Sequence, residues 1–147
     1  MDTSEIPKSL VRLAKYYTIL QLFHITFLTR AGIIYLTESR IPFPAQPPPG
    51  GWGTETIHFL FGMGVTDGLA AGLTLYAGWK LIRKAIFLSK IWAVSITIAM
   101  TSAVIFCFGT LPSGAWQTNT LGYGIVALVF SPLLIFFLIF IKYLNKR

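Results

Sequence analysis

Long apolar runs alternate with short polar segments along the chain, and four of the runs are long enough to cross a bilayer. They cover residues 16–36, 57–82, 91–111 and 120–141. A helix that crosses about 30 Å of hydrocarbon needs about 20 apolar residues, and lipid offers the backbone no hydrogen-bond partner outside a helix or a closed barrel. Ten-residue blocks with period-two alternation, which a barrel needs, do not occur. The pattern therefore predicts an all-α polytopic membrane protein, an antiparallel four-transmembrane-helix bundle that forms one domain over residues 1–147.

The composition supports a membrane protein and excludes other classes. The chain of 147 residues is 54% hydrophobic and 12% charged, whereas an ordinary soluble domain is about 25% charged. The net charge of +7 does not indicate nucleic-acid binding, because no charged residue lies between Ile91 and Ile141 and the basic residues flank the apolar runs instead. A single cysteine excludes thiol exchange within the chain. We expect the partners to be the lipid bilayer and other membrane helices, from other subunits or from further copies of the chain, and not nucleic acid.

The basic residues predict how the chain is threaded. Apart from Arg30 and Arg40, every one of the 12 Lys and Arg residues lies before the first run, beside the loop between the second and third, or after the fourth. The positive-inside rule places that side in the cytoplasm. We therefore expect a multi-pass protein of a plasma or inner membrane with both termini cytoplasmic. Tyrosines and tryptophans at the predicted inner boundaries are expected to anchor the helices at the bilayer edge; these are Tyr16, Tyr17, Tyr76, Trp79, Trp92 and Tyr143.

Two segments outside the apolar runs have patterns of their own. Ile6, Leu10 and Leu13 alternate with basic residues at helical spacing, which predicts a short amphipathic segment on the inner membrane surface. The outer loop 37–55 contains five of the eight prolines, followed by glycines. A stiff connector that ends in a turn is the simplest interpretation of this loop. A strip that docks a partner and a lid over an outer cavity are the alternatives.

Small residues mark a candidate packing face on the second apolar run. Glycines spaced by four allow helix backbones to approach closely, and the run contains Gly64, Gly68 and Gly72. Ala71 and Gly78 extend the small face. The spacing does not decide whether this seam lies within the bundle or between protomers.

Ionisable residues inside the apolar runs are the main candidates for a site, because a charge in the bilayer is costly. Asp67 is the only acid in the apolar interior, and Arg30 is the only arginine there. The long arginine side chain predicts an ion pair between the first two helices. The pair would fix their register, or serve as a proton relay or a contact for an anionic substrate. Otherwise Asp67 is protonated or hydrogen-bonded elsewhere, and Arg30 extends to the membrane surface.

The two histidines are expected to have separate roles. His58 lies nine residues from Asp67, about 180° around the helix, so we expect it at the outer interface. His24 is expected to be a hydrogen-bonded core residue that can approach Asp67. The histidines differ by about 16 Å in depth, which disfavours haem held by both of them. No Cys/His cluster has the spacing of a metal site, so neither a metal nor another cofactor is predicted.

Three classes of function fit these features. The small size and the glycine seam favour a non-catalytic subunit or interaction partner of a larger membrane assembly. The first alternative is a transporter or a proton or ion pathway centred on Asp67 and Arg30, with His24 as a further candidate. The second alternative is an intramembrane lipid-binding protein or enzyme that opens to the outer leaflet. Neither a phosphate-binding loop nor a nucleophile elbow occurs, which favours a non-enzymatic role.

Overall fold

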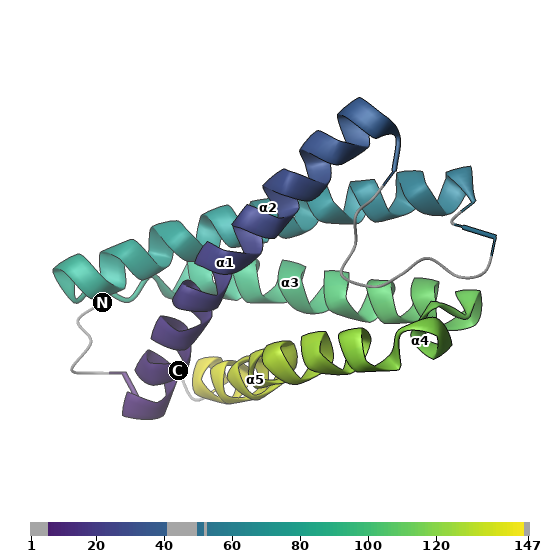
Figure 1. The fold of residues 1–147 in the computed structure, drawn as a ribbon. Coiled ribbons are helices and arrows are strands. Elements are labelled where there is room, and N and C mark those ends of the chain that lie inside the picture. The colour runs from purple at the N-terminus through teal and green to yellow at the C-terminus, as the bar shows by residue number, and fades with distance from the viewer. Residues whose placement is uncertain (1–5, 41–49, 52, 146–147) are drawn as a thin grey trace.

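The computed structural model describes residues 6–40, 50, 51 and 53–145, and its elements are helices (Figure 1). In chain order these are α1 (Lys8–Glu38), α2 (Thr54–Lys84), α3 (Ser89–Thr110), the 3-10 turn η2 (Leu111–Ser113), α4 (Ala115–Thr118) and α5 (Thr120–Leu144). The helices α1, α2, α3 and α5 are long and apolar enough to cross a membrane. The all-α fold and the four apolar helices predicted from the sequence are therefore confirmed, whereas the orientation of the chain stays a prediction.

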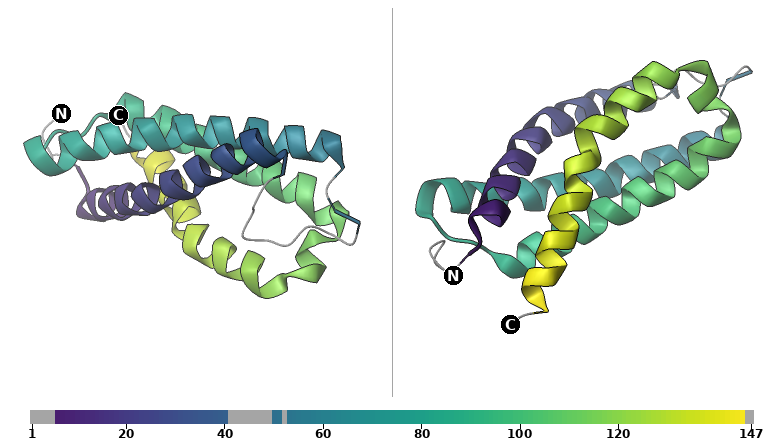
Figure 2. Two further views of the ribbon diagram at one scale, coloured as in Figure 1. Left: turned by 45° about the horizontal axis from the view of Figure 1, so that its top comes forward. Right: turned by 90° about the horizontal axis from the view of Figure 1, so that it is seen from below.

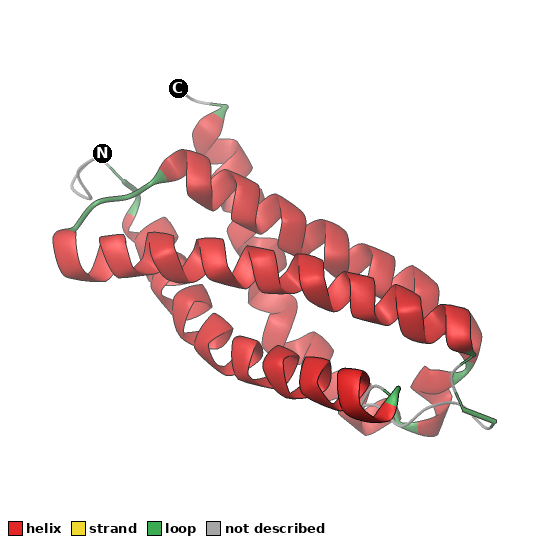
Figure 3. Ribbon diagram, turned by 90° about the horizontal axis from the view of Figure 1, so that it is seen from above, coloured by secondary structure: helices red, strands yellow, loops and turns green. Residues whose placement is uncertain are grey.

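The long helices lie against one another along much of their length. α2 and α3 run side by side in opposite directions, and α1 crosses α2 obliquely (Figures 1 and 3). α5 contacts α3 and α1 (Figure 2). α1 and α2 each contain 31 residues, or about 46 Å of helix. Both are longer than the hydrocarbon core, so their ends extend into the polar layers.

The start of α1 differs from the expected surface segment. The helix runs without interruption from Lys8 to Glu38, and Leu10 and Ala14 are fully buried in the main hydrophobic cluster. The apolar face of this segment is therefore covered by protein. The amphipathic pattern in the sequence cannot distinguish that cover from a lipid surface.

Aromatic side chains form the core at the end where α1, α3 and α5 meet. Phe136 packs edge-on against Tyr17 and Trp92, with ring centroids 6.1 and 5.6 Å away. Trp92 also stacks on Phe87. Tyr17 and Trp92 are 2% and 0% exposed, so these two residues belong to the core and are not the boundary anchors that the sequence predicted.

Hydrogen bonds organise the short connection between α3 and α5. Gly114, with a φ of 79°, makes the turn between η2 and α4 in the left-handed region that glycine adopts without strain. The Asn119 side chain accepts a hydrogen bond of 3.0 Å from the Gly122 amide and so caps α5. Trp116 stacks on Tyr123 with 4.7 Å between ring centroids. The connection between α3 and α5 is therefore built mostly from the helical turns η2 and α4.

The proline-rich loop falls mainly outside the described residues. This applies to its five prolines and to Trp52. The connector, docking strip and lid considered for this loop therefore stay predictions.

Candidate functional site

The packing of α1 on α2 decides which side chains face the interior. Thr18 lies against Gly78. Nearer the other end of the pair, Tyr35 stacks on Phe61 with 4.2 Å between ring centroids. Between these contacts, the Leu28 Cδ2 atom lies 4.0 Å from the position that a Cβ on Gly64 would take. Positions later in α1 thus meet positions earlier in α2, and the middle of α1 lies beside the segment of α2 that contains Asp67.

Serine and threonine side chains join α2 to α3. Thr74 and Ser95 form a hydroxyl–hydroxyl hydrogen bond, and the Ser95 Oγ also donates to the Ala70 carbonyl at 3.3 Å. About two turns away along both helices, the hydroxyls of Thr66 and Ser102 lie 3.1 Å apart. Such bonds between helices replace the water that the bilayer does not supply.

Asp67 lies on the same face of α2 as these polar contacts. Ala71 and Thr74 are fully buried on this face, and Asp67 itself is half-buried. The Ser102 hydroxyl is the polar neighbour of the Asp67 carboxyl across the α2–α3 contact. We refer to the group gathered here as the polar core; it consists of Tyr17, Gln21, Asp67, Thr74, Ser95 and Ser102.

The Tyr17 hydroxyl is buried without a hydrogen-bond partner in the part of the chain that the structure describes. Gln21 and Thr74 are its polar neighbours, but neither completes a bond with good geometry. A buried hydroxyl without a partner is uncommon in folded proteins. The polar core therefore contains a buried donor without a partner among the described residues.

His24 is hydrogen-bonded, as expected, but it is half-buried and lies outside the hydrophobic core clusters. Its Nδ1 atom lies 3.1 Å from the Gln21 Oε1 atom, and its ring packs edge-on against Phe130 of α5 at 5.1 Å. His24 therefore reaches the polar core through Gln21. It does so next to α5 and shows no direct bond to Asp67 among the contacts described.

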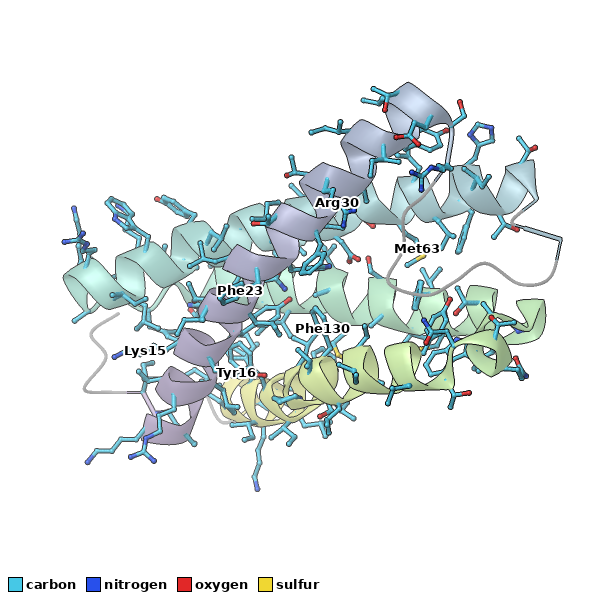
Figure 4. The ribbon with its side chains drawn as sticks, viewed as in Figure 1. Lys15, Tyr16, Phe23, Arg30, Met63 and Phe130 are labelled. Atoms are coloured by element: carbon cyan, nitrogen blue, oxygen red, sulfur yellow. The ribbon has the colours of Figure 1, made fainter. Side chains whose placement is uncertain are left out.

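Arg30 does not form the predicted ion pair with Asp67. Among the side chains that the structure describes, the one ion pair joins Arg40 to Glu38, with 2.6 Å between Nε and Oε2. Arg30 is exposed on α1 and lines an open surface depression with its neighbours on that helix (Figure 4). The reason is helical geometry: Arg30 lies about 160° around the helix from Leu28, which faces α2.

The glycine stripe of α2 is only partly used within the chain. Gly64 faces Leu28, whereas no atom lies within 4 Å of the Cβ position of Gly68 or Gly72. The closest approach of α1 occurs at Gly78, where a Cβ would overlap Thr18. At the other end of the α1–α2 pair, His58 and the Tyr35 hydroxyl form a hydrogen bond of 2.8 Å. His58 therefore links the helix ends, away from Asp67, as predicted.

Asp67 is the one member of the polar core that was predicted as a site residue, and Tyr17 and Ser102 illustrate why the others were not. Tyr17 was interpreted as a boundary anchor, and Ser102 was not singled out. A signal for Tyr17 exists in the sequence, because it shares a seven-residue register with Leu10 and His24. Its neighbouring stripe at the same interval contains Ala14, Gln21, Leu28 and Tyr35. Ser102 shows the same interval, because it lies seven residues after Ser95 on one face of α3.

Comparisons with known proteins add no assignment to this geometry. No family model matches the chain, and no curated protein and no solved structure is similar to it. Among the described residues, no three His, Cys, Asp or Glu side chains come together as a metal site would require. Any function therefore has to be argued from the polar core and from the surfaces of the four helices.

Proposed function

We propose that this small multi-pass membrane protein relays protons, and that Asp67 is the group that takes up and releases the proton. One observation carries the proposal: the Asp67 carboxyl faces neutral hydroxyls, and no basic side chain of the described residues forms an ion pair with it. The sequence alone favoured a non-catalytic subunit, with a proton pathway as the alternative. The arrangement of Arg30 and Asp67 supports the alternative.

Charge compensation explains why the missing ion pair matters. A carboxylate in a bilayer costs at least a few kcal/mol when nothing compensates its charge. Arginine would supply a permanent compensating charge and would make Asp67 a structural residue. A neutral hydroxyl such as that of Ser102 compensates the charge only in part, so a bound proton has to complete the compensation. A proton bound by a single carboxyl can leave again, which a relay requires.

The polar core covers part of the way across the membrane. On α2 it extends from the level of Asp67 to that of Thr74, seven residues or about 10 Å. His24 and Gln21 extend it along α1 toward α5. The aromatic cluster around Phe136 closes the end next to Tyr17. A complete pathway therefore requires a second conformation or a second copy of the chain.

Infrared difference spectroscopy on the full chain in liposomes tests the proton site directly. We expect a protonated carboxyl band that changes with pH and is lost in Asp67→Asn. Glu38→Gln is the matched control, because Glu38 is exposed at the end of α1 and outside the polar core. A band that stays constant over the pH range in which the protein is folded would show that Asp67 does not exchange its proton, and the proposal would be wrong.

Proton flux into the same liposomes tests the relay. With a membrane potential applied, we expect wild type and Glu38→Gln to conduct and Asp67→Asn to fall to the level of empty liposomes. Helical content and elution volume should stay unchanged. Flux that needs sodium ions would assign the site to a small cation instead. Equal flux in wild type and Asp67→Asn, or none in either, would leave the polar core as a purely structural element.

A second candidate function, membrane subunit, is supported by the exposed side of α2. Gly68 and Gly72 have open space beside them, and Val65 and Leu69 next to them are exposed. A helix of another chain could approach closely there. Replacing Gly68 and Gly72 by leucine should then lower the mass of the purified assembly. The equivalent change at Gly124 of α5, which is also open, should leave that mass unchanged.

A further inference from the structure

The last turns of α2 combine aromatic and basic side chains on one face. Their positions are three, four, seven and eight residues from the first, which places them together on a helix. The residues are Tyr76, Trp79, Lys80, Arg83 and Lys84. The opposite face of these turns contains Ala77 and Leu81, which are buried against the core. The aromatic and basic set, which we call the basic face of α2, is therefore turned outward.

Contacts between cations and rings order the basic face. The Lys80 Nζ atom lies 4.8 Å from the centroid of the Trp79 ring and 5.5 Å from that of Tyr76. The Lys84 Nζ atom lies 5.8 Å from the Trp79 ring. Tyr76 and Trp79 are 47% and 48% exposed, so the rings remain available to a ligand. Cation–π attraction holds both ammonium groups next to the rings at the end of the helix.

An apolar strip continues from the basic face toward the middle of α2. Leu69 is 57% exposed, and no atom lies within 4 Å of the Cβ position of Gly72. Leu69, Gly72 and Tyr76 follow one another at intervals of three and four residues, on one side of the helix. The acidic side chains whose surroundings the structure describes lie elsewhere: Glu38 at the far end of α1 and Asp67 in the polar core. None of these described acids neutralises the three cations.

We propose that the basic face of α2 binds an anionic phospholipid. Arg83 receives the phosphodiester, because a guanidinium presents two parallel donors to phosphate oxygens. Lys80 and Lys84 supply the remaining positive charge, and the rings of Tyr76 and Trp79 lie at the level of the headgroup. One acyl chain follows the strip past Gly72 and Leu69. The continuity of this strip with the cations favours a lipid over a soluble phosphate, which would use the charges alone.

Native mass spectrometry of the full chain tests this site. The protein is released from micelles that contain equal amounts of phosphatidylglycerol and phosphatidylcholine with the same acyl chains. We expect phosphatidylglycerol to be retained in preference. The triple change Lys80→Gln, Arg83→Gln and Lys84→Gln should weaken its retention about tenfold or more, because each basic residue near the headgroups contributes to binding.

A second triple variant provides the matched control. Lys8→Gln, Arg12→Gln and Lys15→Gln remove the same charge at the same end of the molecule from exposed positions on α1, and should keep retention within about twofold of wild type. Equal losses in both variants would indicate diffuse electrostatic attraction and would overturn the proposal. Equal retention of both lipids would also overturn it. Displacement of the lipid by inorganic phosphate would assign the face to a soluble anion.

Discussion

Thr18 of α1 lies directly against Gly78 of α2, with no space for a β-carbon between them. The Thr18 hydroxyl donates a hydrogen bond of 2.8 Å to the Ala14 carbonyl one turn earlier. This bond fixes the threonine side chain, which is also branched at Cβ and therefore stiff. The two helices approach most closely at this point. Two residues of the polar core lie beside the contact: Tyr17 precedes Thr18 on α1, and Thr74 lies one turn before Gly78 on α2.

Gly78→Leu is expected to destabilise the protein, because the new side chain overlaps Thr18 and pushes α1 away from α2. Overpacking of this kind typically costs about 1–3 kcal/mol. Gly72→Leu is the control: it adds the same atoms to the same helix, where nothing lies within 4 Å. Unfolding in mixed detergent micelles measures the free energy of both variants. Equal losses would mean that glycine at position 78 is not required by the helix contact.

The sequence predicted the apolar helices well and the contacts between them only in part. Hydropathy identifies a span because lipid requires a long apolar helix. Hydropathy does not show which side of the span faces protein, since lipid-facing and buried residues are equally apolar. On α2 small and polar residues mark the buried side instead, because Ala71 and Thr74, which share the face of Asp67, are fully buried.

On α1 the sign of the charges suggested the wrong partner. Arg30 and Asp67 are complementary and lie at similar depth, but an ion pair also needs the arginine on the face that meets α2. That face is set by Leu28 and Tyr35, which pack on Gly64 and Phe61. Tyr17 was misplaced for a related reason. An aromatic residue near the end of a helix is equally suited to the bilayer edge and to a core, and only the packing of α5 onto it decides between them.

Arg30 and Asp67 are expected to contribute independently to stability. In a double-mutant cycle with Arg30→Gln and Asp67→Asn, the coupling free energy should be near zero, within about 0.5 kcal/mol. Unfolding in mixed micelles supplies the four free energies. A favourable coupling above about 1 kcal/mol would show that the two side chains pair in the membrane, and it would remove the basis for a proton site at Asp67.

Thr74 and Ser95 are expected to be coupled, because their hydroxyls bond to each other between α2 and α3. The cycle built from Thr74→Val and Ser95→Ala should give a coupling of about 0.6–1.7 kcal/mol, the range found for bonds between membrane helices. Thr26→Val combined with Ser95→Ala provides the control, since the exposed Thr26 hydroxyl donates to Leu22 within its own helix. Coupling of the same size in both cycles would contradict a specific bond.

Tyr17→Phe separates packing from polarity at the edge of the polar core. The hydroxyl is buried and makes no hydrogen bond to the described residues, so its removal is expected to leave the free energy of unfolding unchanged or to raise it slightly. Tyr17→Ala should instead cost about 3–5 kcal/mol, because the ring packs against Phe136. We expect the infrared band assigned to Asp67 to shift in Tyr17→Phe, because both side chains belong to the polar core. A loss of stability above about 1 kcal/mol in Tyr17→Phe would show that the hydroxyl is hydrogen-bonded in the membrane, and an unshifted band would show that Asp67 titrates without it.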